Sequence, residues 1–146
     1  MSEFIFSVLP AAVEFYDRQQ HLKARLEGGY QTTAAGLFNT GQADALATET
    51  LIYRIEEVLE SEGRIVSPGG IAICHDPLLG RVCGDFLAGE TTITPAGVEV
   101  AFNRLSEQLS YAPLALTGLQ TGTFCYFVFI REMIHHLQIA HLYYQP

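Results

Sequence analysis

Residues Thr121–Tyr144 read TGTFCYFVFIREMIHHLQIAHLYY, and the fold prediction depends on this stretch. It contains seven consecutive apolar or aromatic residues, Phe124–Ile130, followed by Arg131 and Glu132. Side chains this apolar are buried or paired in folded proteins, so we expect the segment to lie in the core. Three of the five histidines of the protein come next: His135, His136 and His141.

The same stretch fits either a strand or a helix, because its aromatic and β-branched residues are common in strands. Its apolar side chains nevertheless recur at helical intervals, at Phe124, Phe127, Ile130, Ile134 and Leu137, and His141 continues the series. We therefore predict a helix that is buried on more than one side and central to the fold.

Apolar periodicity predicts further helices over residues 8–27, about 42–62, 76–89 and from 94 to about 109. Asp76-Pro77 and Thr94-Pro95 are typical of helix starts, with a capping side chain followed by proline in the first turn. Between the second and third helices, RIVSPGGIAIC at residues 64–74 predicts a β-hairpin around the turn Ser67–Gly70. Residues Thr91–Ile93 are a candidate short strand.

The expected fold is therefore mainly α: a single domain over residues 1–146, built as a bundle of four to five helices with a small β-hairpin inserted around residues 64–74. A chain of 146 residues is of ordinary size for one domain. No internal repeat or linker-like segment divides it.

The composition is acidic and poor in charge. Hydrophobic residues make up 49% and charged residues 16%, with a net charge of −8 and a single lysine, Lys23. Nucleic-acid affinity comes largely from cations that displace counterions, so binding to DNA or RNA is disfavoured. A surface with so few charges predicts that apolar area is covered by a protein partner or by a second copy of the chain.

Cysteine content and hydropathy indicate a cytoplasmic protein. Three cysteines, an odd number, without a secretory signal favour reduced thiols. The longest apolar run has seven residues, Phe124–Ile130, whereas a membrane-spanning helix needs about 20. We expect no membrane span.

Glu132-x-x-His135 is the one spacing typical of a metal site. It places a carboxylate and an imidazole on one helix face, as ferritin-like bundles present two of their ligands. Those proteins repeat the motif on a second helix, and this chain does not. Helical carboxylates that could add a ligand are Glu14, Glu49, Glu56 and Glu99. Without a second motif, a surface or interface pair beside Arg131 is the competing interpretation.

A second candidate cluster is Cys74-His75-Asp76 with Cys83 and Asp85. His75 and Cys83 could ligate a divalent metal, or Cys83 could act as a nucleophile if Arg81 lowered its pKa. The competing interpretation assigns Asp76 to a helix cap and Cys74 to a buried strand.

Glu56-Glu57-Val58-Leu59-Glu60 resembles the E-E-x-x-E half of the magnesium site in all-helical nucleotide pyrophosphohydrolases. The other half, an E-x-x-D pair on a following helix, is missing. These acids are therefore interpreted as the solvated face of a helix.

No complete catalytic set, nucleotide-binding loop or organic-cofactor motif occurs in the sequence. The expected function is binding: a small acidic protein that acts through protein–protein contacts as an adaptor, chaperone-like or inhibitory partner and associates with itself, for example as a homodimer. Seven tyrosines and nine phenylalanines suit such a role, because interfaces favour aromatic residues. The alternative is a helical metal- or ligand-binding protein, or an enzyme, that uses Glu132 and His135 or the region around His75 and Cys83.

Overall fold

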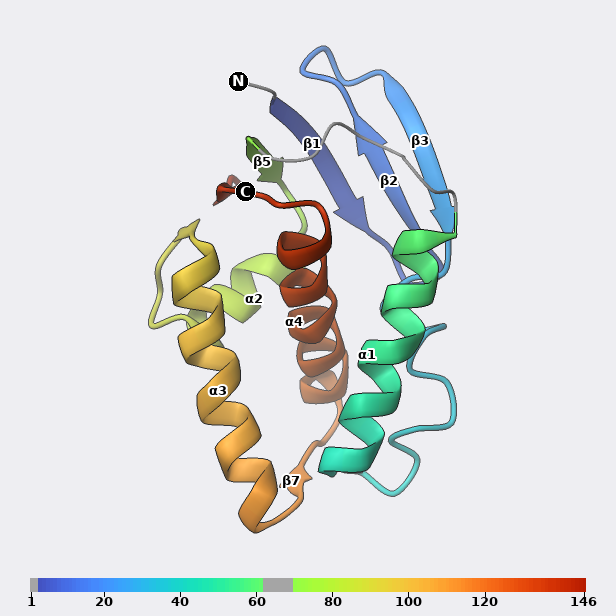
Figure 1. The fold of residues 1–146 in the computed structure, drawn as a ribbon, viewed down its shortest axis with the longest axis vertical. Coiled ribbons are helices and arrows are strands. Elements are labelled where there is room, and N and C mark those ends of the chain that lie inside the picture. The colour runs from blue at the N-terminus through green and yellow to red at the C-terminus, as the bar shows by residue number, and fades with distance from the viewer. Residues whose placement is uncertain (1–2, 62–69) are drawn as a thin grey trace.

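The computed structural model describes residues 3–61 and 70–146, and over these residues the chain forms a six-stranded mixed sheet with four helices (Figure 1). The strand order is β3-β2-β1-β5-β8-β6, and β4 and β7 form a separate two-stranded ribbon. The strands are β1 (Glu3–Val8), β2 (Ala12–Tyr16), β3 (Leu22–Glu27), β4 (Gln42–Ala43), β5 (Ile71–Cys74), β6 (Thr92–Ile93), β7 (Leu114–Ala115) and β8 (His141–Tyr144). The helices are α1 (Ala45–Glu60), α2 (Pro77–Phe86), α3 (Pro95–Tyr111) and α4 (Leu119–His136).

The centre of the sheet is parallel and its edges are antiparallel. Strands β1, β5 and β8 run in the same direction, β2 and β3 extend the sheet as an antiparallel meander, and β6 closes the other edge. The predicted mainly-α bundle is therefore wrong: the chain has an α/β fold in which a mixed sheet is combined with four helices.

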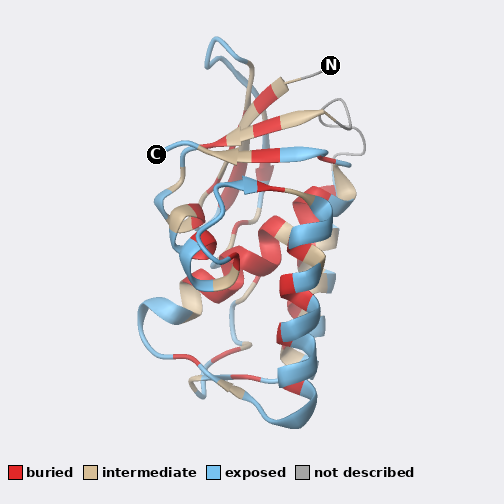
Figure 2. Cartoon of the chain, turned by 90° about the vertical axis from the view of Figure 1, so that its left-hand side faces the viewer, coloured by how far each residue is buried: buried red, intermediate tan, exposed pale blue. Residues whose placement is uncertain are grey.

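The two faces of the sheet differ in burial. Along β1, Phe4, Phe6 and Val8 are buried, and the residues between them are only half-buried. Such alternation is typical of a strand whose side chains point to opposite faces. Figure 2 shows the helices on one side of the sheet. We call the opposite side the open face. Its larger side chains are Ile5, Tyr16, Ile71, Ile73 and Tyr143, all of intermediate exposure.

Helix α4 lies at the centre of the helical layer, as predicted. Every residue of Phe124–Ile130 is buried, and the helix packs against α1, α2 and α3. The helix ends at His136, and the chain continues into β8 through Gln138, which has a positive φ of 54°. The predicted continuation of the helix to His141 is wrong, because the stepping of apolar residues past Leu137 coincides with the start of a strand.

Three other helices confirm the sequence prediction. Helices α1, α2 and α3 occupy the expected segments, and Thr91–Ile93 contributes β6. The carboxylate of Asp44 accepts a hydrogen bond from the Ala47 amide, and the Thr94 hydroxyl accepts one from the Gly97 amide. These caps satisfy amides at the helix starts that have no partner within the helix.

No helix among the described residues is long and apolar enough to cross a membrane.

The helix predicted over residues 8–27 is wrong. This segment forms the end of β1 and the hairpin of β2 and β3. The Asp17 carboxylate accepts hydrogen bonds from the amides of Gln19 and His21 and so shapes the turn between the strands. The prediction used five apolar positions, Val8, Ala12, Phe15, Leu22 and Leu26. They fit a helix and two short strands equally well, so their spacing could not decide between the two.

The hairpin predicted around residues 64–74 is only partly testable. Its second arm is strand β5, Ile71–Cys74, which pairs in parallel with β1 and β8. Its first arm lies outside the described residues. A strand with two parallel neighbours in the middle of a sheet is not a peripheral insertion, so that part of the prediction is wrong.

Asp76 is the N-cap residue of α2, as predicted, but its side chain joins three elements and makes no cap bond to the helix. Its carboxylate accepts hydrogen bonds from the Ser7 hydroxyl at 2.6 Å, the Val8 amide at 2.8 Å and the Tyr126 hydroxyl at 2.7 Å. Asp76 therefore ties the ends of β1 and β5 to the central helix α4.

Replacing Asp76 with alanine should destabilise the protein by about 3 kcal/mol, because hydrogen bonds to a charged group contribute about 1.5–3 kcal/mol and their donors would be left without an acceptor. Urea denaturation measures this change. Asp85→Ala, at an exposed carboxylate on α2, is the matched control and should change stability little. Equal stability of the two variants would contradict the assigned role.

Candidate metal centre

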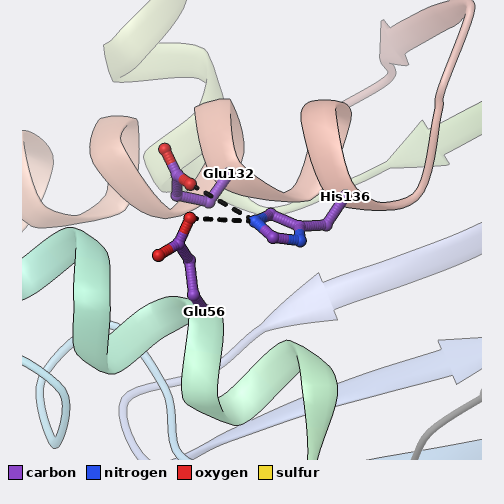
Figure 3. A group of neighbouring side chains, drawn as sticks. All are labelled: Glu56, Glu132 and His136. Atoms are coloured by element: carbon purple, nitrogen blue, oxygen red, sulfur yellow. Dashed lines mark hydrogen bonds and ion pairs between the residues drawn. The ribbon is translucent and has the colours of Figure 1, made fainter.

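Three side chains of types that can ligate a metal converge between α1 and α4: Glu56 from α1, and Glu132 and His136 from α4 (Figure 3). The Nε2 atom of His136 lies 3.2 Å from Oε2 of Glu56 and 3.6 Å from Oε1 of Glu132. One donor atom from each residue lies within 4.8 Å of the other two. This is the one group of three or more such side chains found among the residues that the structure describes.

Helix geometry explains the convergence. Glu132 and His136 are four residues apart, which places them one above the other on the same face of α4. Helices α1 and α4 lie side by side and end near the sheet, so the last turns of the two helices meet (Figure 1). Glu56 projects from α1 across this contact toward α4 (Figure 3).

Glu132 is the buried member of the cluster, with 2% of its surface exposed. Burial raises the pKa of this carboxyl group, and the adjacent Arg131 guanidinium partly opposes the shift. Nη1 of Arg131 donates to Oε2 of Glu132 at 2.7 Å. The second oxygen, Oε1, faces His136 and is left for the cluster.

Arg131 is itself held in place. Its Nε atom donates to Oε1 of Glu99 on α3 at 2.8 Å, and its guanidinium carbon lies 4.1 Å from the centre of the Phe102 ring. Pairing with Arg131 lowers the pKa of Glu99. Since Arg131 serves two carboxylates, it does not fully neutralise Glu132.

The second ring nitrogen of His136, Nδ1, lies 3.7 Å from Oε2 of Glu60. Metal-binding histidines commonly place the nitrogen that is not bound to metal toward a carboxylate or a carbonyl, which orients the ring. His136 has this arrangement, with Nε2 toward Glu56 and Glu132 and with Nδ1 toward Glu60.

The region is strongly acidic. Glu56, Glu60 and Glu132 surround His136, and Arg131 is shared with Glu99. The C-terminal ends of α1 and α4 add the partial negative charge of their unpaired carbonyl groups. A cation in the cluster, either a metal ion or a proton on His136, would offset this charge.

The two His136 contacts are compatible with ion pairs and also with ligands that share one metal ion. A charge-assisted N–H···O bond is about 2.7–2.9 Å long, and the His136 contacts to Glu56 and Glu132 are longer, at 3.2 and 3.6 Å. Ligands about 2.0–2.1 Å from a tetrahedral zinc ion lie about 3.3 Å from one another. The two contacts bracket that value.

Of the two ligands predicted on α4, the structure places one in the cluster and one outside it. Glu132 lies in the cluster, whereas His135 is exposed and lies outside it. The rings of His135 and His136 are 5.7 Å apart between centroids. The charge of His135 is one of the causes that lower the pKa of Glu99 on α3.

His75 and Cys83 do not belong to any group of three donor side chains within the described parts of the chain. His75 is exposed, and its Nδ1 atom lies 2.6 Å from the carbonyl oxygen of Gln145. Cys83 is buried on α2, and burial raises the pKa of its thiol. A raised pKa disfavours the thiolate that a nucleophile or a metal ligand requires. All three cysteines are buried and free.

Sequence reasoning missed His136 as the partner of Glu132. The spacing Glu132-x-x-x-His136 is a second helical spacing that brings side chains together, and the sequence contains it beside Glu132-x-x-His135. Glu56 was one of several available carboxylates. Only the packing of α1 on α4 distinguishes it from the others.

Comparison with known proteins adds no information about the function of this site. No protein-family model matches the chain, and no curated protein matches it either.

The raised pKa of Glu132 predicts a pH-dependent effect in metal-free protein. Burial disfavours the ionised form of Glu132 in the folded state. Protonated Glu132 is therefore better accommodated at low pH, and this contribution to stability is lost as the pH rises through the raised pKa. Relative to wild type, Glu132→Gln should therefore gain stability between acidic and neutral pH. Urea denaturation with a chelator at several pH values tests this, and a pH-independent difference would contradict it.

Proposed function

We propose that this protein binds a divalent transition-metal ion through Glu56, Glu132 and His136. The observation that supports this proposal most directly is the buried Glu132 carboxylate, which directs one oxygen toward an imidazole and a second carboxylate from another helix. Burial of an ionised carboxylate is costly unless a cation compensates it. Arg131 pairs with the other oxygen of Glu132 but is shared with Glu99, so a metal ion would supply the remaining compensation.

The ligand set favours particular metals. One imidazole nitrogen and two carboxylates suit zinc, manganese or ferrous iron. Magnesium and calcium prefer ligand sets made only of oxygen, so they should bind more weakly. Glu56 is 39% exposed at its side chain, which leaves room for water as a further ligand.

The ion would join α1 to α4 where both helices end near the sheet. Arg131, fixed by Glu99 and by the Phe102 ring, would orient Glu132, and Glu60 would orient the imidazole. Outer groups of this kind commonly change metal affinity by 10–100-fold. Metal binding is the proposed activity, and no reaction is assigned to the site.

Zinc and manganese should each bind at one ion per chain and stabilise the fold. At a free metal concentration about 100 times the Kd, binding to the folded state adds about 2.7 kcal/mol. This gain should raise the thermal midpoint by about 10 °C for a chain of this size. Isothermal titration calorimetry and thermal denaturation of protein without a histidine tag measure both effects.

Matched variants locate the binding. Glu132→Gln and His136→Gln should abolish the calorimetric signal, whereas Glu57→Gln on α1 and His135→Gln on α4 should keep it, because both control residues are exposed and lie outside the cluster. Binding should strengthen as the pH rises, since a proton competes for the histidine. Stabilisation that survives in the folded His136→Gln variant would contradict the proposed site.

A second candidate function, action through protein–protein contacts, is supported by a different feature. The open face presents apolar and aromatic side chains of several strands that are only half-buried. Continuous apolar surface of this kind commonly marks a contact site. The two functions use opposite sides of the sheet and are compatible with each other.

A further inference from the structure

A hollow of about 320 Å³ opens where the parallel strands β1 and β5 end. Side chains that line it include Ile5 and Ser7 of β1, Tyr16 of β2, and His75 and Asp76 directly after β5. Pockets for small molecules commonly measure about 300–1,000 Å³ and combine apolar walls with a few converging polar groups. The hollow has this mixed lining and a volume at the lower end of the range.

The hollow occupies a position in the sheet at which α/β proteins commonly bind ligands. Strands β1 and β5 are parallel neighbours. After β1 the chain turns to β2 on one side, whereas after β5 it enters α2 and later reaches β8 on the other side. Open α/β sheets commonly bind ligands outside the carboxyl ends of two strands whose connections diverge in this way.

The hydroxyl protons in the hollow are already in use. The Ser7 hydroxyl donates to Oδ1 of Asp76 at 2.6 Å, and the Tyr16 hydroxyl donates to Oε1 of Glu14 at 2.5 Å. Strand β1 pairs with β2 on one side and with β5 on the other, which engages its backbone amides. The lone pairs of the two hydroxyl oxygens remain as acceptors for a ligand.

His75 adds a further acceptor. Its Nδ1 atom lies 2.6 Å from the carbonyl oxygen of Gln145. A carbonyl oxygen can only accept, so Nδ1 carries the proton, and Nε2 of the neutral ring has a free lone pair. Gln20, which is exposed, contributes an amide that both donates and accepts. Among the described residues that line the hollow, acceptors therefore outnumber donors.

Asp76 places a negative charge beside these acceptors. Its carboxylate accepts hydrogen bonds from the Ser7 hydroxyl, a backbone amide and the Tyr126 hydroxyl, and none of these three donors is cationic. Ile5 and Tyr16, both half-buried, offer apolar contact in the same hollow. Tyrosine rings also attract ammonium groups through their π-electrons.

We propose that this hollow binds a small organic cation whose ammonium group donates to Asp76 and to the lone pairs around it, and whose apolar part packs on Ile5 and Tyr16. This inference goes beyond the proposed metal binding and does not depend on it. An ammonium group has three donors and no acceptor, which matches a lining of acceptors around a carboxylate. An anionic ligand would meet like charge and few donors.

An NMR titration of isotope-labelled, chelator-treated protein with phenethylammonium tests the inference, with neutral 2-phenylethanol and anionic phenylacetate as matched probes. Salt at about 0.15 M screens non-specific attraction of a cation to the acidic chain. The amine should bind with a Kd on the order of millimolar and shift the amide signals of Ser7, Val8 and Asp76. The alcohol should bind at least tenfold more weakly, and phenylacetate should cause no saturable shifts.

Variants with matched controls locate the binding. Asp76→Asn should weaken binding of the amine at least tenfold, because it removes the charge and keeps the shape of the side chain. Asp85→Asn removes the same charge from an exposed position on α2 and should leave binding unchanged. If Asp76→Asn does not fold, His75→Ala decides: it should weaken binding at least threefold, whereas the exposed His135→Ala should not weaken it.

Equal affinity for the amine and the alcohol would overturn the inference. Amide shifts confined to the acidic helix α1 would do the same, as would an equal loss of binding in Asp76→Asn and Asp85→Asn. Unchanged binding in His75→Ala also counts against the hollow as the site. None of these results bears on the metal centre, because the protein is titrated without metal.

Discussion

Burial of the apolar run Phe124–Ile130 is the constraint on which the rest of the structure depends. All seven side chains are buried, which requires partners around the whole circumference of α4. Helices α1, α2 and α3 supply them, and the sheet receives the chain immediately after the helix ends. Burying even one such side chain is worth about 1.5–3 kcal/mol, so burial of this run contributes strongly to the stability of the helical layer.

The same constraint produces the candidate metal centre. Helix α4 is enclosed along its apolar run, and it carries Arg131 and Glu132 directly after that run. Arg131 reaches Glu99 on α3, and Glu132 turns toward α1. Glu132 therefore remains a buried carboxylate with one oxygen available, beside the only imidazole that α4 directs toward α1.

The helices could be predicted from local sequence, and the sheet could not. The caps at Asp44 and Thr94 and the stripes of α1 and α3 are local signals. By contrast, β5 is four residues long, and it is a central strand only because β1 and β8 lie on either side of it. Those neighbours are distant in sequence. The site shows the same division. Glu132 and the i, i+4 spacing to His136 are local features of one helix, whereas the choice of Glu56 required the packing of α1 on α4.

X-ray absorption at the zinc edge tests most directly whether Glu56, Glu132 and His136 form one coordination site. Protein purified without a histidine tag and loaded with one equivalent of zinc should show a first shell of one imidazole nitrogen with oxygen ligands at about 2.0–2.1 Å. The imidazole contribution should disappear in His136→Gln and persist in His135→Gln. A spectrum that contains sulfur ligands, or that is unchanged by His136→Gln, would contradict the account.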